Sequence, residues 1–180
     1  MTSTVGFCQK STQTRVSSDV YYQTKYGWFD RGTGVKSDDR KRRFGEVLTP
    51  RWVVEMMLDQ VPDVRLPDVT VFEPACGEGA FLTCVLRRKL ACARNDAERV
   101  RACQTCYGID IQYDNVEICR ARLTAIASDD GVDADTAARI FVRNVIHGDM
   151  LFFPMLARFY DWTDGTWTTL EEMAGCEIQW

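Results

Sequence analysis

The stretch Val69-Thr-Val-Phe-Glu-Pro-Ala-Cys-Gly-Glu-Gly-Ala-Phe81 joins an apolar run to an acidic residue, a proline and two glycines. The run Val69–Phe72 is typical of a buried strand, because β-branched and aromatic side chains pack well on a pleated surface. Gly77 and Gly79 permit positive φ and let a ligand approach the main chain closely. Apolar residues at helical spacing over 79–91 follow directly. The stretch therefore predicts a strand, a ligand-binding loop and a helix N-terminus in succession.

The same alternation continues along the chain. Segments with apolar residues at helical spacing are separated by short apolar runs. Such alternation implies an α/β fold with a parallel sheet and right-handed crossovers. The helices are expected over residues 49–61, 79–91, 96–103 and 114–127, and the strands over 69–72, 105–111 and 140–146.

Capping and turn residues mark the expected ends of these elements. Thr49 is predicted to cap the first helix, with Pro50 at its first helical position. Pro62 is predicted to stop that helix. Asp164-Gly165, between aromatic and β-branched residues, predicts a hairpin near the end of the sequence. The residues of the first helix expected to face the core are Val53, Val54, Met57, Leu58 and Val61.

Composition divides the 180 residues into two parts. Residues 1–43 are rich in Ser, Thr and Gly and are interpreted as a partly flexible N-terminal arm, whereas residues 44–180 form the folded domain. The formal net charge of −4 excludes a protein that wraps nucleic acid by overall charge. The clear basic cluster, Arg40-Lys-Arg-Arg43, is interpreted as a solvated linker.

The eight cysteines are expected to be reduced and mostly buried. Residues 1–18 lack the apolar core of a signal peptide, and no apolar run reaches the roughly 18 residues of a membrane span. We therefore expect a cytoplasmic protein without membrane contact. Cys103 and Cys106 form the one CxxC pair, and His147 is the one histidine. Because a zinc site usually needs a second pair of ligands, no metal site is expected.

The loop around Gly77 and Gly79 excludes two common nucleotide sites. A dinucleotide fingerprint requires Gly or Ala where this chain has Leu82, and a P-loop requires Lys and Ser or Thr after the glycines. Glu73 would also repel a pyrophosphate. A carboxylate instead suits a cationic ligand such as S-adenosylmethionine, which carries a sulfonium and an ammonium group.

Four segments of the chain are informative together: Phe44–Pro50, Glu73–Phe81, Tyr107–Ile111 and Asn144–Leu151. They resemble motifs of the N6-adenine DNA methyltransferases of restriction-modification systems. Glu73–Phe81 resembles their first cofactor motif, (D/E)PACGSGxF, and Phe44–Pro50 is similar to their F-G-x-(F/Y)-(F/Y)-T-P element. Tyr107–Ile111 resembles their second motif and Asn144–Leu151 their third. The segments occur in the family's order.

This resemblance implies a Rossmann-like methyltransferase fold that binds S-adenosyl-L-methionine and acts on adenine in DNA. In the family, the Phe44–Pro50 element closes over the methionine end of the cofactor, the counterpart of Asp110 binds the ribose hydroxyls, and that of Asp149 contacts the adenine amino group. Cys76 is interpreted as a small packing residue rather than a nucleophile, and His147 as structural. The cofactor-binding residues expected from the resemblance are Phe44, Thr49, Pro50, Glu73, Ala75, Cys76, Gly77, Gly79, Phe81, Asp110, Ile111, Asp149 and Met150.

The chain departs from the family at the catalytic element, (D/N/S)-P-P-(Y/F/W). None of its five prolines is adjacent to another, so no catalytic residue is assigned. Tyr160-Asp-Trp162 places a carboxylate between aromatics, but it lacks the prolines and is better explained as part of the hairpin.

Three interpretations follow. The first is a DNA adenine methyltransferase of the restriction-modification type, either a compact variant or a natural half whose protein partner supplies the catalytic element and the DNA-reading surface. The second is a non-catalytic module that binds the cofactor or a partner. The third is methylation of RNA, protein or a small molecule, which the form of the motifs makes less favourable than DNA.

Overall fold

The computed structural model describes residues 49–150 and 157–169, together with Arg42, Glu172 and the backbone of four short strands between residues 15 and 29. These strands form two antiparallel pairs inside the segment interpreted as an arm. The division into an arm and a domain stays a prediction. The pairs are β1 (Arg15–Val16) with β2 (Asp19–Val20), and β3 (Tyr22–Thr24) with β4 (Gly27–Phe29).

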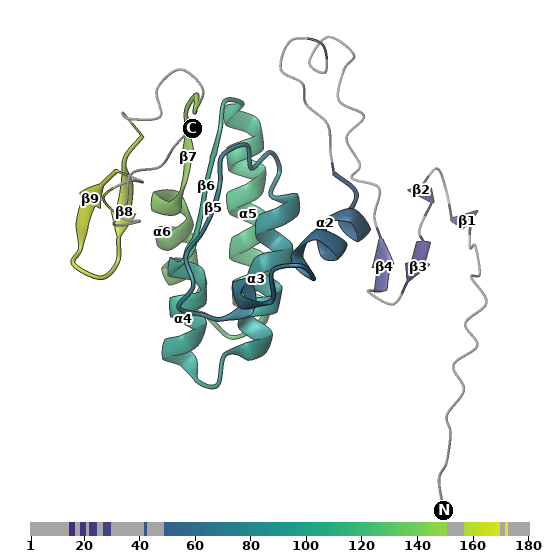
Figure 1. Cartoon of the computed structure of the whole chain (residues 1–180), viewed down its shortest axis with the longest axis horizontal. Coiled ribbons are helices and arrows are strands. Elements are labelled where there is room, and N and C mark those ends of the chain that lie inside the picture. Colours follow the sequence, from purple (N-terminus) through teal and green to yellow (C-terminus); the bar gives the residue numbers. More distant parts are fainter. Residues whose placement is uncertain are drawn as a thin grey trace, which may run out of the picture.

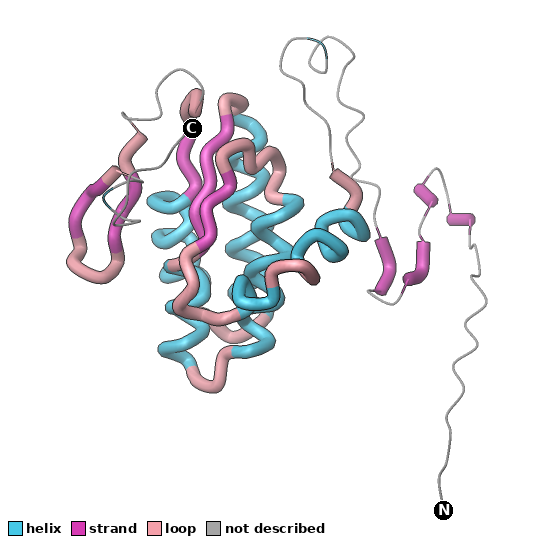
Figure 2. The backbone as a smooth tube through the Cα atoms, viewed as in Figure 1, coloured by secondary structure: helices cyan, strands magenta, loops and turns pink. Residues whose placement is uncertain are grey.

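A three-stranded parallel sheet lies at the centre of the described domain (Figures 1 and 2). Its strands, in spatial order, are β5 (Val71–Glu73), β6 (Cys106–Asp110) and β7 (Val145–His147). Helices connect the successive strands, so the α/β fold with a Rossmann-like parallel sheet is confirmed.

Helices α3 and α4 lie between β5 and β6 in the chain, and α5 and α6 lie between β6 and β7. Within the described ranges, no helix has both the length and the apolar character needed to cross a lipid bilayer. The helices are α2 (Arg51–Leu58), the 3-10 helix η1 (Pro62–Arg65), α3 (Ala80–Cys92), α4 (Asp96–Gln104), α5 (Tyr113–Asp129) and α6 (Ala134–Asn144).

The boundaries predicted for the first helix are wrong at both ends. Pro50 is the extended N-cap residue rather than the first helical one, and its carbonyl accepts from the N–H groups of Val53 and Val54. The helix ends at Leu58, and Pro62 begins η1 instead of stopping α2. Met57, inside α2, and Val61, beyond its end, were expected in the core but are about half exposed, at 50% and 53%.

The strand predicted over 140–146 is also wrong, because most of it is α6. The Asp133 side chain accepts from the Thr136 N–H at 2.9 Å and caps this helix. The buried residues of α6 recur at helical spacing, and the strand β7 begins only after the helix ends. These buried residues are Ala137, Ile140, Phe141 and Asn144.

The two faces of the sheet carry different apolar clusters, as the alternation of side chains along a strand requires. Val71, Cys106 and Val145 pack with the helices. The opposite cluster contains Tyr107 and Ile109 of β6, with Phe72 and Ile146 packed against it. All five residues of β6 are buried, because both faces of this middle strand are covered.

The predicted hairpin is confirmed as β8 (Phe159–Asp161) and β9 (Thr166–Thr168), and it covers the second face. Phe159 is fully buried, and its ring meets those of Phe72 and Tyr107 edge-on at centroid distances of 5.2 and 5.9 Å. In Figure 1 the hairpin stands on the side of the sheet away from α3 and α5.

Candidate functional site

The carboxyl ends of the three parallel strands bring Glu73, Asp110 and His147 to one edge of the sheet. Glu73 ends β5, Asp110 ends β6 and His147 ends β7. The register pairs Glu73 with Gly108, and Asp110 with His147. Ligands of parallel α/β sheets bind at this edge, so the sequence and the fold indicate the same location.

Main-chain hydrogen bonds fix the loop between β5 and α3 against the end of β6. The Cys76 N–H donates to the Ile109 carbonyl at 3.0 Å, and the Gly77 N–H donates to Asp110 Oδ2 at 2.9 Å. The Gly79 N–H donates to the Cys76 carbonyl at 2.8 Å, which closes a turn within the loop. The N-terminus of α3, with its outward-pointing N–H groups, is thereby held beside the strand ends.

Asp110 organises this edge through contacts that the sequence alone did not reveal. Its Oδ1 accepts from the Gln112 N–H at 2.8 Å and from Asn115 Nδ2 at 3.3 Å. Its main-chain carbonyl accepts from the Gly148 N–H at 3.0 Å, which holds the loop after β7. Asp110 therefore joins three loops, two through its carboxylate and the third through its main-chain carbonyl. The four lone-pair positions of the carboxylate leave capacity for a ligand hydroxyl.

Glu73 is half-buried beside the same loop. Burial raises the pKa of its carboxyl above the ordinary value, while the N–H of Ala75, which donates to it, acts in the opposite direction. A partly desolvated carboxylate is poised to interact strongly with a cation, since the low local dielectric strengthens their attraction.

Gly77 and Gly79 both have positive φ, at 52° and 86°, but differ in their surroundings. A Cβ at Gly77 would meet nothing within 4 Å. A Cβ at Gly79 would lie 2.7 Å from the Sγ of buried Cys119 on α5. Gly77 thus leaves the outer surface of the loop open, whereas Gly79 permits close packing between α3 and α5.

This difference predicts unequal costs for alanine at the two glycines. Gly77→Ala should lower the free energy of unfolding only by its left-handed backbone strain, about 1–2 kcal/mol. Gly79→Ala adds the collision with Cys119 and should cost clearly more. Urea denaturation measures both, with Gly131→Ala as the control, since Gly131 has φ 91° and equally open surroundings. Equal costs at the three positions would contradict the packing role of Gly79.

Cys76 is buried at the back of the loop. Its thiol hydrogen bonds with that of Cys119, and this contact together with burial raises its pKa far above the ordinary value. The neutral thiol is a poor nucleophile, which supports its interpretation as a packing residue. Gly108 makes room for this packing, because a Cβ there would lie 3.0 Å from Cys76 Cβ and 2.8 Å from Leu82 Cδ1.

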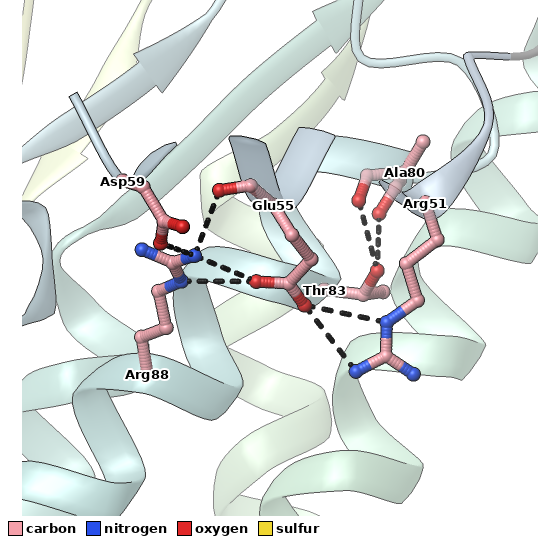
Figure 3. Close-up of polar contacts among 7 residues, drawn as sticks. Arg51, Glu55, Asp59, Ala80, Thr83 and Arg88 are labelled. Atoms are coloured by element: carbon pink, nitrogen blue, oxygen red, sulfur yellow. Dashed lines mark hydrogen bonds and ion pairs between the residues drawn. The ribbon is translucent and has the colours of Figure 1, made fainter. Parts of the chain in front are cut away.

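Ion pairs between α2 and α3 set the position of Thr49 and Pro50, which precede α2 (Figure 3). Arg88 of α3 donates to Glu55 Oε2 at 2.8 Å, to the Glu55 carbonyl at 2.9 Å and to Asp59 Oδ1 at 2.7 Å. Arg51 contacts the other oxygen of Glu55 at 3.3 Å. Because Glu55 is buried, this network fixes the start of α2 relative to α3.

An ion pair also connects the loop 74–79 to α5. Glu78 is buried, and its Oε2 lies 2.8 Å from Arg122 Nη2. Arg122 Nη1 also donates to the Glu78 carbonyl at 3.0 Å. Sequence reasoning missed both residues, because their separation of 44 positions gives no local signal.

The remaining expected site residues lie around the same edge with different exposure. Ile111 is 43% exposed directly after Asp110, and Phe81 is half-buried at the start of α3. Asp149 is half-buried, whereas the Met150 side chain is buried in the cluster of Tyr107 and Ile109. Phe44 lies outside the described residues.

His147 contacts the segment that follows β6. Its Nε2 donates to the Ile111 carbonyl at 3.0 Å, and its ring meets that of Tyr113 edge-on. Cys103 and Cys106 are buried free thiols, and burial raises their pKa values to about 12 and about 11. Among the residues that the structure describes, no group of three His, Cys, Asp or Glu side chains is arranged to hold a metal ion.

A protein family and a characterised protein both resemble part of this chain. The family model for N-6 DNA Methylase matches residues 36–138, more than half of the chain. Over 69 residues the chain is 44% identical to the type II restriction enzyme and methyltransferase RM.BcgI of Heyndrickxia coagulans. That stretch covers 38% of this chain but only 10% of the relative. No solved structure matches the chain. The chain belongs to the N-6 DNA methylase family.

Proposed function

We propose that this chain binds S-adenosylmethionine at the edge formed by Glu73, the loop 74–79 and Asp110, and that it serves N6 methylation of adenine in DNA. The observation that carries the proposal is the hydrogen bond from the Gly77 N–H to Asp110 Oδ2. It joins the first and second motif segments into one surface, although they are far apart in the sequence. Cofactor use is also what membership of this family implies.

The residues present fit this cofactor. The partly desolvated Glu73 carboxylate pairs with a cationic group, and Asp110 has capacity to accept from ribose hydroxyls. The exposed side chain of Ile111 offers an apolar surface to the adenine, and Asp149 accepts from its amino group. Thr49 and Pro50 cover the methionine end. When bound, the cofactor supplies an electrophilic methyl group on its sulfonium.

The chain's own part in the reaction is to bind and orient the cofactor. The sequence contains no adjacent prolines and therefore no catalytic element of the family type. We propose that a protein partner supplies that element.

Transfer of a radiolabelled methyl group to adenine-containing DNA tests the proposal. The chain is assayed alone and mixed with the parts of the Heyndrickxia coagulans relative that lie outside the aligned stretch. Cofactor binding with transfer only in the mixture supports a partner-dependent methyltransferase. Cofactor binding without transfer in either assay favours the second candidate, a non-catalytic binding module, which the missing proline pair motivates. A folded chain that binds no cofactor overturns both.

Glu73 gives cofactor binding a characteristic pH dependence. Its raised pKa means that protonation begins at a higher pH than for an ordinary glutamate, so cofactor affinity should fall as the pH is lowered. Glu73→Gln should bind more weakly with little dependence on pH. Calorimetric titration between about pH 5 and pH 8 measures both.

The same shift predicts an opposite effect on stability. A carboxyl whose pKa is raised by folding contributes stability at low pH and loses it as the pH rises through the folded pKa. Glu73→Gln should therefore make the cofactor-free protein slightly more stable at pH 7. Weaker binding without this gain in thermal stability would argue that the variant acts by disturbing the loop.

A further inference from the structure

An open groove of about 450 Å³ lies between α6 and the hairpin, outside the proposed cofactor site. Its α6 side presents Ala138, Arg139, Val142 and Arg143, and its hairpin side presents Trp167 of β9. The end of α6 leads directly into the start of β7, whereas the cofactor edge is formed by the other ends of the strands. The two sites are therefore separate.

Neither arginine of this groove forms an ion pair with a carboxylate in the part of the chain that the structure describes, and the exposed Asp133 carboxylate acts on Arg139 only at longer range. Arg139 Nη2 donates to Thr136 Oγ1 at 3.0 Å, and Arg143 Nη1 donates to the Arg139 carbonyl at 3.1 Å. Both partners are neutral, so each guanidinium keeps its charge and further N–H donors. In a chain with a net charge of −4, this is a local cationic surface.

Aromatic rings lie beside these charges. The Arg143 guanidinium stands over the rings of Tyr160 and Trp162, at 5.2 and 5.7 Å from their centroids. Trp167 meets Tyr160 edge-on at 5.6 Å, yet 55% of its surface is exposed. An indole held in place by a neighbouring ring but open to solvent is suited to stacking against a flat ligand.

The hairpin wall of the groove is firmly attached to the domain. Trp162 Nε1 donates to Oδ1 of the fully buried Asn144 at 2.8 Å. Asn144 in turn donates to main-chain carbonyls before and in β6, including that of Cys106 at 3.0 Å. The Tyr107 hydroxyl donates to the Tyr160 carbonyl at 2.9 Å. The groove is therefore a pre-formed surface, not a gap beside a free loop.

We propose that this groove binds a nucleic-acid strand, with backbone phosphates on Arg139 and Arg143 and a base stacked on Trp167. Guanidinium groups recognise phosphate, and base–aromatic stacking tolerates any sequence. An acidic peptide would use the arginines but would leave the flat exposed indole without a role. The inference rests on the DNA partner of the proposed function and places a second DNA contact away from the cofactor edge.

Fluorescence anisotropy with a labelled single-stranded DNA of mixed sequence, over a series of salt concentrations, tests the groove. Arg139→Gln and Arg143→Gln should each weaken binding several-fold and reduce the slope of log K against log salt by about one. Trp167→Ser should weaken binding about 5- to 100-fold and leave the slope unchanged. The control is Arg94→Gln, an arginine whose side chain is 85% exposed on another surface and paired with Glu98.

Three results would overturn the proposal that the groove binds nucleic acid. These are no DNA binding by the unaltered chain, equal binding by all variants, or displacement of the DNA by polyglutamate at concentrations similar to those of unlabelled DNA.

A duplex of the same sequence should bind more weakly than the single strand, because its bases are already stacked. Tighter duplex binding would exclude the stacking role of Trp167. Cofactor titration of the same variants separates the two proposals, since loss of groove binding leaves cofactor affinity unchanged.

Discussion

Replacing Asp110 with alanine should weaken S-adenosylmethionine binding by at least tenfold. A hydrogen bond to a charged group contributes about 1.5–3 kcal/mol, and the substitution removes both the proposed ribose contact and the acceptor for the Gly77 N–H. The loss of acceptors for Gln112 and Asn115 should also lower thermal stability. Calorimetric titration and thermal denaturation measure the two effects.

Two further variants make this result specific. Asp110→Asn keeps one carbonyl oxygen and should retain more stability than alanine while still binding the cofactor poorly. Asp96→Ala is the matched control, since its carboxylate is 95% exposed and pairs with Arg99 one turn away on α4. Wild-type affinity in folded Asp110→Ala would exclude Asp110 from the cofactor site.

Replacing Arg88 with methionine should lower the free energy of unfolding by about 3 kcal/mol or more. Removal of one partner from a buried ion pair leaves the other charge poorly compensated, since the Glu55 side chain is only 9% exposed and its other cation, Arg51, is 38% exposed. Arg51, at 3.3 Å, is the remaining cation beside Glu55 in the drawn cluster (Figure 3). Urea denaturation measures the loss.

Arg94→Met provides the comparison, because the exposed Arg94–Glu98 pair on the surface should contribute little to stability. The double variant Glu55→Gln, Arg88→Met should recover part of the stability, since it removes the stranded charge as well. If Arg88→Met were as stable as Arg94→Met, the α2–α3 network would not hold the start of α2 in place.

Elements with strong local signals were predicted closely from the sequence. The helix expected over 79–91 is Ala80–Cys92, and the strand expected over 105–111 is Cys106–Asp110. In both cases the apolar pattern predicts the type of element, and the flanking glycine or polar residues predict where it ends. The position of Asp110 at a strand end followed from the same local pattern.

The failures have a common physical cause in tertiary context. The run Ile140–Ile146 is rich in β-branched residues, which is typical of a strand. Its first part is helical instead, because the apolar face of this helix packs against α4 and α5. Lys89 of α3 is fully buried, and it donates to the Val69 carbonyl and to Thr105 Oγ1. No sequence pattern indicates such partners.

The contacts that assemble the candidate site were likewise beyond local prediction. Gly77 and Asp110 are 33 positions apart, as are Glu55 and Arg88. Motif resemblance identified the residues of the loop and the strand end, but it did not identify Gln112, Asn115 or Arg122. These partners depend on how α5 packs beside α3, which only the folded chain defines.

Calorimetric titration of the purified, unaltered chain with S-adenosylmethionine tests the central claim most directly, with S-adenosylhomocysteine titrated separately. Because both ligands carry the adenosine and the ammonium group that Asp110 and Glu73 are proposed to bind, both should bind with micromolar affinity at one site per chain. A chain that unfolds cooperatively on heating, and is therefore folded, but gives no binding heat and no thermal stabilisation with either ligand would contradict the account.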